Sequence, residues 1–288
     1  MGGPPSQPSN APLLLVDGHN LLWGATFGFP AEVRSRDKTR NLTGLFAFFA
    51  LLRVAVRDEL PAPPEIIVVF DGEHGSAGRR ATDDSYKAQR PTNPAALAPL
   101  LFLPHVKRGL DAAGITWVEL PHDEADDVIA TLTTTTPAGR EVIVMSRDRD
   151  FYQLVSPQVR ILNTRFRAGT RLVDPAGVRD RHGVDPHQWP DYRALTGDPA
   201  DNIPGVRGIG AGTAVKLLAG GLTLEDLPSS GRLDHGRGRA VTEQWEHALK
   251  WRSMIRLITD LDVPIRPNGR ISPAIPAPRD IVETLQLW

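Results

Sequence analysis

Four short runs rich in apolar residues are spaced along the chain, and a polar segment follows each of them. Short runs with few polar positions predict strands that are buried on both faces of a sheet. Stretches with helical periodicity separate them, and this alternation is typical of a mainly parallel α/β sheet with helices on both faces. The predicted strands are residues 13–16, 66–70, 116–120 and 142–146, and the predicted helices are 43–58, 94–113 and 124–134.

The pattern changes after about residue 163, where shorter helices are separated by turns rich in Gly and Pro. We therefore predict a disordered tail at residues 1–11, an α/β core at 12–163 and a helical region at 164–288. Within the core, residues 75–92 are polar and carry both charges, which predicts an exposed excursion.

Composition narrows the class of protein. The 288 residues include no Cys, which excludes disulfides and any Cys-ligated zinc or iron–sulfur site. The longest apolar run has eight residues, at 45–52, whereas a membrane span needs about 20. The N-terminus lacks the basic and apolar regions of a signal peptide, so we expect a soluble, cytoplasmic protein with no membrane partner. A net charge of −1 argues, taken alone, against nucleic acid as a partner.

Acidic residues follow the predicted strands and also lie in the loop at residues 196–202. A single Asp after a strand is usually a turn former or a helix cap. Ligands of open parallel sheets bind beyond the carboxyl ends of the strands, however, so these carboxylates should converge there. They repel one another unless they bind protons or multivalent cations. The nine acids are Asp17, Asp71, Glu124, Asp126, Asp127, Asp148, Asp150, Asp198 and Asp201.

Carboxylate ligands without Cys suit Mg²⁺ or Mn²⁺, and two such ions can catalyse attack on a phosphodiester. On a helix, Glu124 and Asp127 are about 60° apart, so Asp127 could stand between its neighbours around one ion. In an extended segment, Asp148 and Asp150 would point to the same side.

Six motifs together closely resemble the 5′-nuclease (flap endonuclease) family, in particular the 5′–3′ exonuclease domain of bacterial DNA polymerase I and its stand-alone paralogues. The resemblance implies a Rossmann-like (PIN-like) sheet and a helix–hairpin–helix at about residues 190–220, and it extends over nearly the whole chain from Leu13. The motifs are Val16-Asp-Gly-His-Asn20, Val69-Phe-Asp-Gly72, Tyr86-Lys-Ala-Gln-Arg90, Glu124-Ala-Asp-Asp-Val-Ile129, Ser146-Arg-Asp-Arg-Asp150 and Tyr192-Arg-Ala-Leu-Thr-Gly-Asp-Pro-Ala-Asp-Asn-Ile-Pro-Gly-Val-Arg-Gly-Ile-Gly210.

The resemblance assigns the acids to two metal clusters. The first comprises Asp17, Asp71, Glu124, Asp126, Asp127 and Asp148, and the second comprises Asp150, Asp198 and Asp201.

Residues 75–92 correspond to the family's helical arch, through which a 5′ single strand threads. There Tyr86, Lys87, Arg90 and Arg79 match basic and aromatic positions of the arch. On one helical face, Lys87 and Arg90 would clamp the scissile phosphate, and Tyr86 would stack on a base.

The helix–hairpin–helix would bind duplex phosphates through its Gly-rich turn, with K⁺ as a mediator in the family. Its candidate residues are Gly205, Arg207, Gly208, Gly210 and Lys216. Two positions depart from the family pattern: Gly24 stands where polymerase-linked relatives usually carry Arg, and Gln89 replaces a common Asn.

These features predict a structure-specific 5′–3′ exonuclease or flap endonuclease that acts by a two-metal mechanism. Its substrates would be DNA with 5′ ends, flaps or nicks, and RNA primers on DNA, and we expect a nucleoid-associated monomer of bacterial type. One alternative is a catalytically inactive branched-DNA-binding protein of the same fold, and another is a PIN-like ribonuclease. Without the nine acids, 25 acidic residues remain against 33 basic ones, a balance of +8 that suits DNA.

Overall fold

The structure of the chain, a computed structural model, describes residues 10–288. Most of the tail predicted at residues 1–11 therefore lies outside the described residues.

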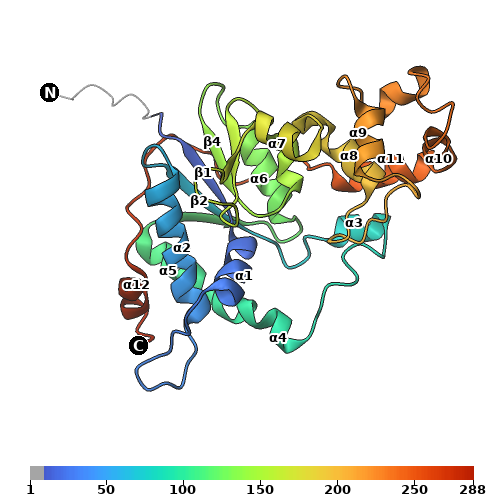
Figure 1. Ribbon diagram of the computed structural model, residues 1–288. Coiled ribbons are helices and arrows are strands. Elements are labelled where there is room, and N and C mark those ends of the chain that lie inside the picture. The colour runs from blue at the N-terminus through green and yellow to red at the C-terminus, as the bar shows by residue number, and fades with distance from the viewer. Residues whose placement is uncertain (1–9) are drawn as a thin grey trace.

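Within residues 10–288, six strands form one sheet in the order β3-β2-β1-β4-β5-β6 (Figure 1). The pairs from β3 to β5 are parallel, and β6 runs antiparallel to β5. The predicted α/β class with a mainly parallel sheet is confirmed, but the short strands β5 and β6 were not predicted. The strands are β1 (Leu13–Asp17), β2 (Glu65–Phe70), β3 (Thr116–Glu119), β4 (Val142–Met145), β5 (Val159–Leu162) and β6 (Leu172–Val173).

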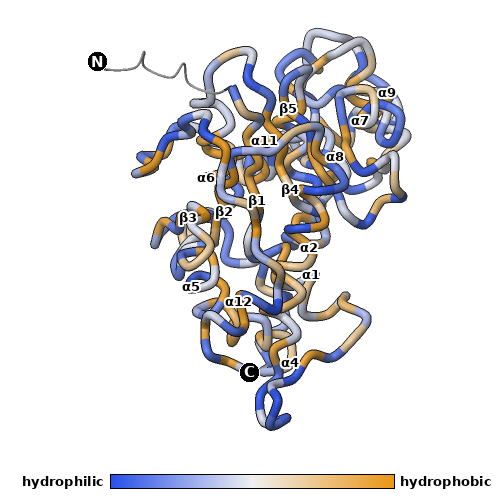
Figure 2. Tube along the Cα trace, turned by 90° about the vertical axis from the view of Figure 1, so that its left-hand side faces the viewer, coloured by the Kyte–Doolittle hydropathy of each residue, from blue (hydrophilic) through white to orange (hydrophobic). Residues whose placement is uncertain are grey.

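Helices cover both faces of the sheet (Figure 1). One face packs against α6 (Ala125–Thr134), and the other packs against α1 (Gly18–Gly28), α2 (Thr43–Glu59), α5 (Leu103–Ala113) and α12 (Pro278–Thr284). Successive strand residues point to opposite faces, so each apolar run contributes to two cores. Leu13 and Leu15 pack in the core with α6, whereas Leu14 and Val16 pack in the other core. Figure 2 shows these strands as hydrophobic stretches inside the molecule.

A helical region lies to one side of α6. It contains α7 (Pro175–His182), α8 (Trp189–Thr196), α9 (Ala211–Leu218), α10 (Gly238–Glu243) and α11 (Trp245–Ile255), with the 3₁₀ helices η2 (Asp150–Leu154), η3 (Pro186–Gln188) and η4 (Leu224–Ser229).

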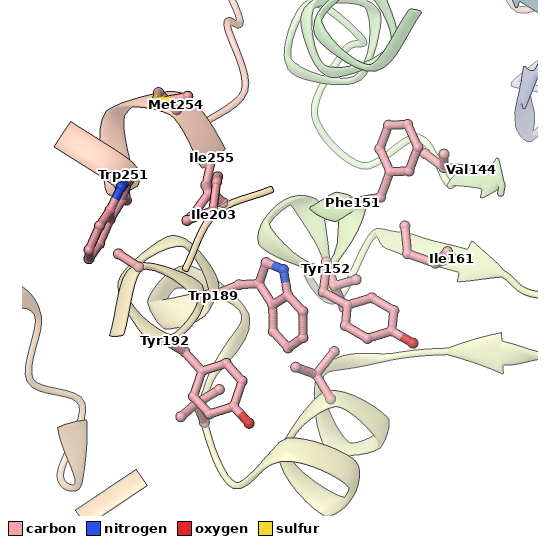
Figure 3. Close-up of a cluster of buried hydrophobic side chains, with 14 of the residues drawn as sticks. Val144, Phe151, Tyr152, Ile161, Trp189, Tyr192, Ile203, Trp251, Met254 and Ile255 are labelled. Carbon is pink, nitrogen blue, oxygen red and sulfur yellow. The ribbon is translucent and has the colours of Figure 1, made fainter. Parts of the chain in front are cut away.

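Trp189 lies at the centre of the contact between this region and the sheet (Figure 3). It is fully buried, and its ring lies 5.0 Å from that of Tyr152 and 5.5 Å from that of Tyr192, between ring centroids. Side chains of β4, η2, α8 and α11 belong to one continuous core. Because the two parts share this core, the loop after α8 is held beside the carboxyl end of β4.

After α11 the chain returns to the α/β part. Residues 256–277 contain no regular helix or strand, and Ser272 Oγ accepts a hydrogen bond of 2.8 Å from Ile66 N in β2. Our grouping of residues 164–288 as one helical region does not describe this last segment. The apolar side chains of α12, such as Ile281 and Val282, are buried against the α/β part instead. Within residues 10–288 no helix is both long and apolar enough to cross a membrane.

Glu65 and Arg140 form a buried ion pair at the amino ends of the strands. The Glu65 carboxylate accepts hydrogen bonds from Arg140 Nη2 (2.5 Å) and Gly269 N (2.8 Å), and Arg140 Nε donates to Ala11 O (2.7 Å). We expect Glu65→Ala to lower the free energy of unfolding by about 3–5 kcal/mol, because it leaves Arg140 buried without its partner.

Chemical denaturation measures this loss. The matched control is Glu141→Ala, because the side chains of Glu141 and its partner Arg160 are 32% and 31% exposed. Ion pairs that are partly open to solvent contribute little, so this variant should lose less than about 1 kcal/mol. Equal losses in the two variants would contradict the importance of the buried pair.

Candidate active site

Asp17 ends β1 and caps α1. Its Oδ1 accepts a hydrogen bond from Asn20 N (3.0 Å), and its Oδ2 accepts one from Ser146 Oγ (2.8 Å), just beyond β4. Burial, followed by the negative charge of Asp71, raises the pKa of Asp17 to about 7. A carboxylate therefore connects two neighbouring strand ends in surroundings that disfavour its charge.

Asp71 follows β2 and faces the start of α6. Its Oδ1 accepts a hydrogen bond from Ala125 N (2.8 Å), and its backbone N–H donates to His19 Nδ1 (3.0 Å). Burial lowers the pKa of His19, so the ring stays neutral and accepts this hydrogen bond.

Three acids stand together at the start of α6, as predicted from their spacing. Ligand atoms of Glu124, Asp126 and Asp127 all lie within 4.8 Å of one another. Burial raises the pKa of Asp126 well above its usual range, although the positive charge of Arg79 opposes this effect. A cation beside Asp126 would therefore stabilise the charged form of its carboxylate.

Arg79, in α3 (Ala77–Thr82), supplies positive charge to this group. Its guanidinium donates two hydrogen bonds of 2.8 Å to Asp127 and also pairs with Glu124. Its Nε donates to Met254 O in α11 (2.9 Å). Asp127 also accepts a hydrogen bond from Ile258 N (2.8 Å), so its carboxylate faces these donors rather than standing between its neighbours.

Residues 83–90 form turns, which corrects the helix expected for this part of the excursion. Lys87 has φ of +55°, outside the helical region, and Pro91 disfavours a helical conformation at Arg90. Tyr86 is only 1% exposed, so its ring is covered and offers no face for the predicted base stacking.

The turns nevertheless place three side chains against the acids. Tyr86 Oη lies within hydrogen-bond distance of Glu124 Oε2 (3.1 Å) and Asp201 Oδ2 (3.3 Å). Lys87 pairs with Glu124, and its Nζ lies 4.0 Å from Asp201 Oδ1. Arg90 Nη2 lies 3.0 Å from the same oxygen. Lys87 and Arg90 therefore reach one carboxylate although no helical face holds them.

The remaining acids surround η2 and the loop after α8. Asp148 is exposed, and its Oδ1 accepts a hydrogen bond from Asp150 N (2.9 Å). Asp150 is buried and accepts a hydrogen bond from Trp189 Nε1 (3.3 Å), so the chain turns here instead of staying extended as assumed. Burial, followed by the charges of Asp148 and Asp198, raises the pKa of Asp150 well above its usual range.

The loop after α8 brings Asp198 and Asp201 to the same place. Asp198 forms an ion pair with Arg193 of α8, and its Oδ1 accepts a hydrogen bond from Ala200 N (2.8 Å). Burial raises the pKa of Asp201, whereas the charges of Lys87 and Arg90 lower it.

A cavity of about 280 Å³, which we call the acidic cavity, opens among the strand ends. Its carboxylate oxygens, together with the unfavourable burial of Asp17 and Asp126, fit a hard divalent cation, and its basic side chains fit an anionic substrate. His19, Asn20 and Trp23 also line it, and we assigned them no role from sequence, although two of them lie in the first motif quoted above. The predicted residues that line the cavity are Asp17, Asp71, Glu124, Asp126, Asp148, Lys87 and Arg90.

The loop between α8 and α9 carries the predicted DNA-binding residues except Lys216, which lies in α9. Gly205 is buried with φ of +72°, and a Cβ there would lie 2.3 Å from Gly197 N, so this glycine serves close packing rather than the surface. Gly210 precedes the first turn of α9, whose N–H groups have no side-chain cap. The exposed members of the predicted set are Arg207, Gly208, Gly210 and Lys216.

Two family models match the chain. The model described as "5′–3′ exonuclease, N-terminal resolvase-like domain" matches residues 12–183, and the model described as "5′–3′ exonuclease, C-terminal SAM fold" matches residues 184–273. The matches are adjacent, and every residue that lines the acidic cavity lies within the first of them.

Curated relatives agree with these models. DNA polymerase I of Deinococcus radiodurans is 34% identical over 290 residues, which covers 98% of this chain and 29% of that protein. Thermostable DNA polymerase I of Thermus thermophilus is 39% identical over 216 residues, which covers 75% of this chain and 25% of that protein. The chain thus spans between a quarter and three-tenths of the length of these relatives.

Solved structures share the fold. The bacteriophage T5 flap endonuclease, in a pseudo-enzyme-product complex with DNA and metal ions, aligns with a TM-score of 0.65 at 21% identity over 86% of this chain and 89% of that one. Human GEN1 in complex with Holliday junction DNA aligns with a TM-score of 0.61 at 15% identity over 96% of this chain and 68% of that one.

Replacing Arg79 by Ala should destabilise the metal-free protein by about 3–5 kcal/mol, because Glu124 and Asp127 would stay buried without their shared counter-charge. Urea denaturation in the presence of a chelator measures this loss. The neighbouring Arg80 is exposed, so Arg80→Ala is the matched control and should lose less than about 1 kcal/mol. Similar stability of the two variants would show that Arg79 does not balance the acids.

The raised pKa of Asp17 predicts a pH dependence of stability. The usual value is 3.8 and the folded value is about 7, so folding favours the neutral form. The difference in stability between the wild-type and Asp17→Asn proteins should be constant below pH 3.8, and the wild type should lose stability relative to the variant as the pH rises from there towards about 7. Chelator-treated samples of both proteins, denatured across this range, test the prediction. A constant difference at every pH would refute it.

Proposed function

The chain belongs to the family of 5′–3′ exonucleases, and we propose that it is a structure-specific nuclease that hydrolyses DNA phosphodiester bonds at 5′ ends and 5′ flaps. The observation that carries this proposal is the acidic cavity, where carboxylates that follow several strands face Lys87 and Arg90. Carboxylates are suited to hold divalent cations, and the two basic side chains are suited to hold a phosphate.

The donor set supports two clusters of divalent cations, for which we propose Mg²⁺ or Mn²⁺. When bound, such cations activate water and stabilise the charge that develops on a phosphodiester in the transition state. The proposed ligands of the first cluster are Asp17, Asp71, Glu124, Asp126, Asp127 and Asp148, and those of the second are Asp150, Asp198 and Asp201.

Basic side chains of the turn segment would position the substrate. Lys87 and Arg90 already contact carboxylates at the cavity, and a phosphate there would offer them a second anionic partner. The left-handed backbone of Lys87 costs about 1–3 kcal/mol in free energy, and strain of this kind clusters at functional sites. Burial raises the pKa of Tyr86, so its hydroxyl stays protonated and donates its single hydrogen bond to Glu124 or to Asp201.

The helical region would hold the duplex. Phosphates bind well at helix N-termini, and the exposed start of α9 at Gly210 has Arg207 and Gly208 before it and Lys216 in its last turn. We propose that these residues contact duplex DNA, with K⁺ as a mediator, and that residues 12–163 form the catalytic part together with Asp198 and Asp201 of the loop after α8. A monomeric state, activity on RNA primers and nucleoid association stay predictions from the family resemblance.

Asp148→Asn should lower the rate of 5′-flap cleavage at least about 100-fold, because losing one cation ligand costs more than losing an outer-shell partner. Binding of the flap DNA should persist, since Asp148 contributes only negative charge. Gel assays with a labelled flap in Mg²⁺ and fluorescence anisotropy measure the two quantities.

The control is Asp262→Asn, which removes an exposed acid on the segment after α11 and should leave cleavage unchanged. Wild-type cleavage rates in the Asp148 variant would contradict the proposed role of this carboxylate. A wild-type protein that binds flap DNA and cuts nothing in Mg²⁺ or Mn²⁺ would identify the chain as a non-catalytic branched-DNA-binding protein.

A further inference from the structure

A second cavity, of about 400 Å³, adjoins the acidic cavity. Asn20, Trp23 and Asp148 line both cavities, so the two share a wall. The distinct feature of the second cavity is its set of three arginines, Arg147, Arg149 and Arg165. We call it the arginine cavity. Its volume is in the range of small-molecule and cofactor sites.

The three arginines have no carboxylate partners within residues 10–288. None of them takes part in an ion pair, and none donates a side-chain hydrogen bond, in the described part of the chain. By contrast, Arg79 and Arg90 beside the acidic cavity are paired with carboxylates. Asp198, which also lines the arginine cavity, is already paired with Arg193. The cavity therefore offers guanidinium donors that an anion can use.

Gly24 makes room for one of these arginines. A Cβ at Gly24 would lie 2.4 Å from both Nη1 and Nη2 of Arg147, so the guanidinium rests directly on the glycine in α1. A helix interior usually disfavours glycine, and here its missing side chain is what admits the charged group. Gly24, which departs from the family pattern, thus allows the Arg147 guanidinium to lie against α1.

Aromatic side chains stand next to the arginines. Trp23 is half-buried and lies 5.8 Å from His19 between ring centroids, and Phe27 is 60% exposed. Both residues line the arginine cavity. Aromatic rings beside arginines are the combination that single-stranded nucleic acid uses, because bases stack on the rings and phosphates bind the guanidinium groups.

We propose that the arginine cavity binds a phosphate of the substrate strand next to the cleaved bond, on Arg147 and Arg165. This inference rests on the proposed function, because it takes the ligand to be a DNA strand that reaches the acidic cavity. The phosphate is either a terminal 5′-monoester or a phosphodiester within an unpaired strand, and both offer the same anionic oxygens.

The test measures binding rather than cleavage. A 5′-flap DNA labelled at a 3′ end is titrated with each protein in a chelator, and its Kd is read by fluorescence anisotropy. Arg147→Gln should bind about 10- to 100-fold more weakly, the loss expected for one or two charge-assisted hydrogen bonds. Arg108→Ala, which removes an exposed arginine on α5, is the matched control and should bind like the wild type.

A second variant guards against a folding defect in the first. Gly24→Ala should displace Arg147 and weaken binding in the same direction, although alanine favours the helix more than glycine does. Thermal unfolding confirms that each variant is folded. If both folded variants bind flap DNA as tightly as the wild type, the arginine cavity is not a phosphate site.

Two further DNAs distinguish the sources of the phosphate. A nicked duplex with a 5′-phosphate and the same duplex with a 5′-hydroxyl are titrated beside the flap. If Arg147→Gln loses affinity only for the 5′-phosphate duplex, the cavity binds a terminal monoester. If it loses affinity only for the flap DNA, the cavity binds an internal phosphodiester. Failure of the proposed function is separate, because it would show as a wild-type protein that binds flap DNA and does not cut it in Mg²⁺.

Discussion

Mutual repulsion of carboxylates at one edge of the sheet is the constraint on which this structure depends. Parallel strands end at the same edge, so every acid that follows a strand is brought towards the others. Burial makes the repulsion stronger, and it raises the pKa of Asp17, Asp126 and Asp150. Arg79 and Lys87 reduce it by pairing with Glu124. Because Arg79 also binds Met254 O, the balance of charge depends on the position of α11.

The hydrophobic core explains how that position is maintained. Trp189 packs between the aromatic side chains of Tyr152 and Tyr192 (Figure 3). Its Nε1 donates a hydrogen bond to Asp150, so an acid of the site is anchored within the contact between the two parts of the chain. The loop with Asp198 and Asp201 follows directly after α8, so the position of α8 determines the position of this loop. Packing energy therefore holds groups together that electrostatics alone would separate.

The net charge of the chain does not reveal that acidic and basic side chains gather at separate places. The chain as a whole carries −1, yet acids concentrate in one cavity while unpaired arginines gather in the next. An anionic strand that passes between these cavities would meet positive charge from Lys87 and Arg90 on one side and from Arg147 on the other. The average charge is thus a poor guide to the partner, because two opposed surfaces cancel in it.

Much of the architecture is local and could be predicted from sequence. Short apolar runs between amphipathic helices indicate a parallel sheet, since a strand buried on both faces is apolar at successive positions. The acids after those runs then converge by topology, as Asp17, Asp71 and Asp148 do at the acidic cavity. Strands such as β6, with two residues, are too short to leave a pattern.

Tertiary structure alone decided the partner of each charged group. From the sequence we expected Lys87 and Arg90 on one helical face and Tyr86 stacked on a base. Instead, Lys87 adopts a left-handed conformation, and Tyr86 is buried beside Glu124 and Asp201. Likewise, no local pattern links Gly24 to Arg147, which are far apart in the chain and meet through the pairing of β1 with β4. The sequence by itself determined which charges the strand ends carry. Only the packing of distant segments decided which of these charged groups are paired, buried or open to a ligand. The reason is that the electrostatic energy of a charged group depends on the residues around it in space, and these come from distant parts of the chain.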